Sequence, residues 1–99
     1  MERSEVYAVV DGERDYQDRK WETIDQRPKQ VGSWLTLMRA ILVKAEMEWA
    51  HTDGDHTALD EIRKLAATAI ACMEQHGALK RKRAELPQVR EGWNVETLT

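Results

Sequence analysis

The apolar-rich stretch at residues 34–49 constrains the fold of this chain more than any other feature. Apolar residues recur there at intervals of three and four, and Trp34, Met38, Ile41 and Ala45 share one face. This spacing is typical of an α-helix, and nearby leucines widen the apolar face. Ser33 precedes the stretch and is a favourable N-cap residue. A helix with so broad an apolar surface is central to its fold or lies at an interface.

Two further segments have helical patterning. Residues 4–21 carry an apolar stripe made of Val6, Val10, Tyr16 or Gln17, and Trp21. A third helix is predicted to begin at Thr57, since Asp60 follows at capping-box spacing, and to stop at Gly77. Its stripe consists of Leu59, Ile62, Leu65 or Ala66, Ala69 and Met73.

The connecting segments carry turn and loop residues. Pro28 and Gly32 predict a loop over residues 23–32, and Asp53-Gly54-Asp55 predicts a tight turn. Residues 78–86 are compatible with a short fourth helix, and strand signals are short and isolated. We therefore expect an all-α antiparallel helical bundle over residues 1–86, followed by a polar tail over residues 87–99.

The composition of the chain limits the functional classes of protein to which it can belong. The chain has 99 residues with 18 acidic and 15 basic side chains, so its net charge of -3 argues against a dedicated nucleic-acid or membrane-surface binder. A single cysteine, Cys72, excludes an intramolecular disulfide and is expected to pack as a small apolar residue. No apolar run approaches the roughly 20 residues of a membrane span, and no signal peptide is evident. These observations predict a cytoplasmic protein without membrane partners.

A block in the first segment, Glu13-Arg14-Asp15-Tyr16-Gln17-Asp18-Arg19-Lys20-Trp21, resembles a signature of small phage and bacterial MazG-like proteins. Trp34-Leu35, the acidic turn and residues 59–74 follow in the order of that family. The resemblance implies a MazG-like helical bundle. It also implies a relationship to all-α nucleoside triphosphate pyrophosphatases, which cut between the α and β phosphates. In those proteins an EExxE on the second helix and an ExxD on the third gather carboxylates for Mg²⁺.

The chain departs from the family at these carboxylates. Ala40, Ile41 and Lys44 stand at the second-helix positions, and Lys64 stands at the second position of the third-helix pair. Only Glu61 remains, and one carboxylate cannot hold a magnesium cluster. The resemblance therefore implies a catalytically degenerate member, without a cofactor, that acts as a binding or regulatory module. Candidate nucleotide or phosphate contacts are Lys20, Trp21, Lys44, Glu61 and Lys64.

Two alternatives stay open. Glu48, Asp60 and Glu61 are candidate ligands of a shifted metal site, which would make the chain an active Mg²⁺-dependent (d)NTP pyrophosphatase. The same acids can instead be solvated helix charges with partners such as Lys44–Glu48. The basic run Lys80-Arg81-Lys82-Arg83 would allow a small nucleic-acid-associated regulator, although the net charge disfavours it.

The sequence also predicts contacts to a protein partner and to a second copy of the chain. Arg81, Lys82, Arg83 and Trp93 are candidate contacts to a protein partner. Three helices leave the broad face of residues 34–49 under-covered, so a homodimer through the second helix is expected. His51, His56 and His76 lack helical ligand spacing and are expected to be turn and surface residues.

Overall fold

A computed structural model describes residues 1–21, 28–52 and 54–82 of the chain. Its helices are α1 (Arg3–Lys20), α2 (Val31–His51) and α3 (Asp55–His76). No strand occurs among the described residues. The predicted all-helical class is therefore confirmed, and the three helices agree closely with the three predicted segments.

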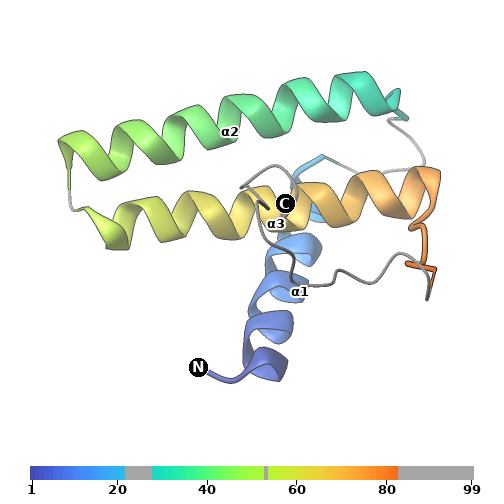
Figure 1. The fold of residues 1–99 in the computed structure, drawn as a ribbon, viewed down its shortest axis with the longest axis horizontal. Helices are drawn as coiled ribbons and strands as arrows, with labels where there is room; N and C mark the ends of the chain where they lie inside the picture. Colours follow the sequence, from blue (N-terminus) through green and yellow to red (C-terminus); the bar gives the residue numbers. More distant parts are fainter. Residues whose placement is uncertain (22–27, 53, 83–99) are drawn as a thin grey trace, which may run out of the picture.

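The helix α3 is the centre of the arrangement. Figure 1 shows α2 and α3 running side by side in opposite directions, while α1 lies on the other side of α3 and crosses it steeply. The extensive helix contacts are those of α3 with α2 and of α3 with α1. The contacts are thus bundle-like, but α3 and not α2 is the helix covered on two sides.

A small aromatic core lies between the far end of α3 and the start of α2. Trp34 and Ala71 are fully buried, and the residues packed against them are Trp21, Leu37, Met38 and Cys72. The indole Nε1 of Trp34 donates a hydrogen bond of 2.8 Å to Gln75 Oε1. The packing predicted for Cys72 is confirmed, because this thiol side chain is half-buried against the cluster.

Both predicted helix starts on the second and third segments are wrong. The N-cap of α2 is Gln30 and not Ser33, and the carbonyl of Gln30 accepts the amides of Ser33 and Trp34. The N-cap of α3 is Gly54 and not Thr57, with a positive φ of 60°. Thr57 instead lies inside the first turn of α3, where its hydroxyl contacts Thr52 Oγ1 at 2.8 Å. The N-cap of each helix therefore lies three residues earlier than its side-chain signal indicated.

The end of α3 follows the sequence, but the fourth helix does not form in the described part of the chain. Gly77 has φ 101° and terminates α3, as predicted. Residues 77–82 are not helical. Residues 83–86 of the predicted fourth helix and the predicted tail over 87–99 lie outside the described residues.

The predicted apolar stripe of α3 is wrong at its largest members. Leu59 and Ile62 are 60% and 45% exposed. The buried positions of α3 are small or polar and comprise Ala58, Glu61, Ala67, Thr68 and Ala71. Ala71 lies against Trp34 of α2 in the core cluster, so small residues take buried positions where the leucine and isoleucine were expected.

Candidate functional site

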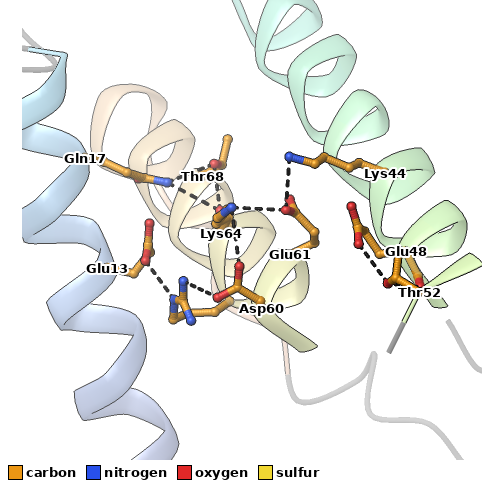
Figure 2. Close-up of polar contacts among 10 residues, drawn as sticks. Glu13, Gln17, Lys44, Glu48, Thr52, Asp60, Glu61, Lys64 and Thr68 are labelled. Carbon is orange, nitrogen blue, oxygen red and sulfur yellow. Dashed lines mark hydrogen bonds and ion pairs between the residues drawn. The ribbon is translucent and has the colours of Figure 1, made fainter. Parts of the chain in front are cut away.

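The carboxylate of Glu61 is held between two lysines at the interface of α2 and α3. Its side chain is 7% exposed, and Oε1 lies 3.0 Å from Lys64 Nζ and 3.3 Å from Lys44 Nζ. Lys44 comes from α2 and Lys64 from the turn of α3 after Glu61 (Figure 2). The structure thus brings together three of the five residues that the resemblance selected, with Lys44 coming from a different helix than Glu61 and Lys64.

Lys44, Glu61 and Lys64 together form a clamp, and a series of further ion pairs continues from this clamp toward α1. Asp60 accepts from Arg63 at 2.7 Å and lies 3.5 Å from Lys64 Nζ. Arg63 also donates from Nε to Glu13 on α1, at 2.7 Å. Figure 2 shows these charges lying in one band that joins the three helices. Acids and bases therefore alternate through the site, and the carboxylates of Glu13, Asp60 and Glu61 each face a cation.

The pKa values at the site respond to these contacts. The hydrogen bond with Glu61 raises the pKa of Lys64, against the opposing effect of burial. The hydrogen bond from Arg63 lowers the pKa of Asp60, and the charges of Arg63 and Lys64 act in the same direction. Both shifts favour the charged forms, so Lys64 and Asp60 remain ionised at neutral pH.

An open groove of about 770 Å³ lies beside the clamp. Its apolar lining combines residues of α1 and α3, namely Val6, Val9, Val10, Leu59, Ile62 and Ala66. Its charged edge includes Lys44, Glu48, Asp60, Glu61 and Lys64. The exposed Leu59 and Ile62, which were expected in the core, therefore belong to the wall of this groove.

A buried amide fixes α1 next to the site. Gln17 is 3% exposed and donates from Nε2 to Thr68 Oγ1 at 3.1 Å and to the Lys64 carbonyl at 3.4 Å. The Thr68 hydroxyl in turn donates to the same carbonyl at 2.8 Å. The backbone of Lys64 is thus held by two side chains, which positions the lysine that meets Glu61.

The candidate ligands of a shifted metal site do not converge. Glu48 accepts a hydrogen bond of 2.9 Å from the Thr52 hydroxyl, while Asp60 and Glu61 face cationic side chains. The expected Lys44–Glu48 pair is replaced by the pair of Lys44 with Glu61. Within residues 1–21, 28–52 and 54–82 no group of three His, Cys, Asp or Glu side chains is placed to hold a metal ion.

Lys20 and Trp21 are not brought to Glu61. Trp21 packs against the cluster of Trp34 and Ala71, which is ten residues along α3 from Glu61. At about 1.5 Å of rise per residue that separation is about 15 Å. The ammonium of Lys29 lies 4.9 Å from the Trp34 ring centre and 6.0 Å from that of Trp21. Trp21 therefore belongs to an aromatic cluster covered by a cation.

The basic candidates after α3 do not line the groove or lie outside the described residues. Arg81 and Lys82 follow α3 in a non-helical, exposed segment, and Arg83 and Trp93 lie outside the described residues. His76 Nε2 is 2.6 Å from the Lys29 carbonyl, and His56 lines the groove. No helix in the described part of the chain is sufficiently long and apolar to cross a membrane.

Several residues that build the site were not singled out as site residues from the sequence. They are Glu13, Gln17, Arg63 and Thr68. Glu13 and Gln17 lie four residues apart and so share one helix face, which is the signal that could have marked a polar contact surface. Their partners on α3 depend on where α1 crosses that helix, and the sequence alone does not give this crossing point.

Comparison of the chain with protein-family models, with curated proteins and with solved structures finds no match.

Proposed function

We propose that the chain is a binding protein on a MazG-like helical scaffold that holds its ligand without hydrolysing it. The observation that carries this proposal is the clamp of Glu61 between Lys44 and Lys64. The carboxylate that a pyrophosphatase would use as a metal ligand already has two ammonium groups as partners.

The clamp disfavours a divalent cation for a direct electrostatic reason. Mg²⁺ binds carboxylate oxygens at about 2.1 Å. Lys44 Nζ and Lys64 Nζ lie 3.3 Å and 3.0 Å from Glu61 Oε1, so a cation at this oxygen would meet two positive charges. The acid next to Glu61 in sequence, Asp60, is paired with Arg63 and Lys64. Metal-assisted attack of water on a phosphate therefore lacks its ligand set here.

The groove fits a phosphate-bearing ligand with an apolar body, and a nucleotide is the ligand class we propose. Its volume of about 770 Å³ is within the range of small-molecule sites. Lys44 and Lys64 would meet the phosphates, with Glu61 fixing both ammonium groups. The apolar wall that includes Leu59 and Ile62 would meet the base and sugar.

We further propose that the protein acts as a homodimer through α2. Large apolar residues on this helix remain exposed in the single chain, among them Leu35, Leu42 and Trp49 at 58%, 47% and 61%. A second copy on this face would remove them from water.

Calorimetric titration with nucleoside triphosphates tests the ligand proposal. Lys44→Gln and Lys64→Gln are each expected to weaken binding by about tenfold, because each removes one charged contact to phosphate. Lys20→Gln is the matched control and should leave affinity unchanged, since Lys20 is the exposed last residue of α1 and does not line the groove. Equal losses in all three variants, or no saturable binding by the unmodified protein, would contradict the assignment of this groove.

A further inference from the structure

One side of α2 carries a regular apolar pattern, and its exposed members indicate how a second copy docks. Apolar residues recur at alternating intervals of four and three along the helix, at Val31, Leu35, Met38, Leu42, Ala45 and Trp49. This is the heptad spacing by which two helices pack along a continuous seam. The 21 residues of α2 extend about 31 Å, which is long enough for three such repeats.

Only one edge of this seam is covered in the single chain. Ala45 is 5% exposed, and Met38 packs against the core cluster. The other edge is open, and its members Val31, Leu35, Leu42 and Trp49 are 46–61% exposed. The pattern therefore continues beyond the surface that α3 covers.

Two opposite charges flank the open edge symmetrically. Arg39 and Glu46 each follow an exposed leucine by four residues, so both lie next to the seam on its solvent side. Arg39 is three residues before Leu42 and Glu46 is three residues after Val43, so the midpoint between the two charges lies between Leu42 and Val43. Neither Arg39 nor Glu46 has an ion pair or side-chain hydrogen bond within the described part of the chain.

We infer that two copies of this chain pair their α2 helices antiparallel, about a two-fold axis that passes beside Leu42 and Val43. This inference rests on the homodimer proposed above and adds its geometry. The two-fold operation reverses the helix about its middle, so Arg39 of one copy lies beside Glu46 of the second. The symmetry repeats this contact, which gives two ion pairs of opposite charge for each dimer.

A parallel pairing would leave the same charges without partners. Identical residues then lie at the same height, so Arg39 would be level with Arg39 and Glu46 with Glu46. In a parallel pair, Arg39 and Glu46 would face the opposite edge of the second copy's seam. That edge carries the buried Trp34 and the half-buried Ile41, which offer no charge. Charge complementarity therefore selects the antiparallel arrangement.

Sedimentation analysis of charge-reversal variants of the full chain tests this geometry. The unmodified protein should sediment as a dimer of two 11.5 kDa chains. Arg39→Glu and Glu46→Arg should each raise the dimer dissociation constant by about tenfold at low salt, because each creates two like-charge contacts. The double variant should restore dimerisation, since its two pairs are again opposite in sign.

The controls separate this inference from the homodimer itself. Arg19→Glu, on the exposed end of α1, should leave the dissociation constant unchanged, and circular dichroism should show that every variant retains its helix content. A monomer at all concentrations, or a chain bound only to a different protein, overturns both the homodimer and the seam. A dimer in which the single reversals have no effect, or in which the double variant fails to recover, overturns the antiparallel seam alone.

Discussion

At the scale of single residues, the polar contacts between α1 and α3 give the fold its specificity. Gln17 and Thr68 are both buried, and Gln17 Nε2 donates to Thr68 Oγ1. A buried donor without its acceptor is costly, whereas the loss of both partners costs much less. Gln17 Oε1 already has no hydrogen-bond partner among the described groups, which adds to the cost of keeping the amide there.

Thr68→Val should therefore lower the free energy of unfolding by about 1–2 kcal/mol. Gln17→Leu combined with Thr68→Val should lower it by less than the sum of the two single changes, because the pair interacts directly. Urea unfolding of the four proteins in the cycle gives the coupling. Strict additivity would show that the bond between these side chains contributes nothing to stability.

The pair of Asp60 with Arg63 predicts a dependence of stability on acid pH. The Arg63 hydrogen bond lowers the pKa of Asp60 below its ordinary value of 3.8. The resulting stabilisation is present above that value and is lost as the pH falls through the lower pKa of the folded state. Because Asp60 is half-exposed, solvent screening limits the effect to about 0.5 kcal/mol.

Thermal unfolding of the unmodified protein and of Asp60→Asn should show this difference. The unmodified protein should be the more stable at pH 5, and the gap should narrow toward pH 2 as Asp60 becomes protonated. A gap that stays constant over this range would mean that the carboxylate charge does not stabilise the fold.

At the scale of helices, two glycines are in opposite backbone situations. Gly54 caps α3 with φ 60° and ψ -125°, a conformation that other residues rarely adopt. Gly12 lies inside α1, and a Cβ added there meets no atom within 4 Å. The same substitution should consequently have opposite effects at the two positions.

Gly54→Ala should destabilise the protein by about 1–2 kcal/mol through backbone strain. Gly12→Ala should stabilise it by about 0.5–1 kcal/mol, because alanine restricts the unfolded chain and favours helix. Chemical denaturation of both variants measures these changes. Destabilisation at Gly12 would show that this face of α1 is packed against something, such as a second copy.

The helices also show what sequence reasoning could and could not determine. The stripe predicted for α1 was right at Val10 and Gln17, which are buried, and wrong at Val6, which is 43% exposed. Gly77 correctly marked the end of α3. Ser33 and Thr57 were misleading because side-chain signals for an N-cap compete with backbone geometry, and the turn at Gly54 starts α3 earlier. The outward position of Leu59 depends on where α1 crosses α3, which no local pattern in α3 contains.

The residues of the candidate site were likewise predicted only in part from the sequence. Glu61, Lys44 and Lys64 were selected from the sequence and lie together. Lys20 and Trp21 were selected with them but do not line the groove, and Trp21 packs in the aromatic cluster at the C-terminal end of α1. The spatial grouping of residues from three helices depends on tertiary packing, so sequence spacing alone could not distinguish the two sets.

At the scale of the whole molecule, the described residues combine a small apolar core with a large exposed apolar surface. The buried apolar residues are few, and most of them are alanines. Among the described residues, many of the larger apolar side chains line the groove or lie on the outer face of α2. Such a surface is costly for an isolated chain, so a ligand in the groove and a second copy on α2 should each raise the apparent stability.

The measurement that tests the central claim most directly is pyrophosphate release from a panel of NTPs and dNTPs with Mg²⁺ or Mn²⁺. The purified protein should release none above the level of a Glu61→Ala control, because the carboxylate at this position faces Lys44 and Lys64 and no ligand set surrounds it. Metal-dependent turnover that disappears in Glu61→Ala would contradict the account. It would show that Glu61 leaves its lysines to bind a metal and that the protein is an enzyme.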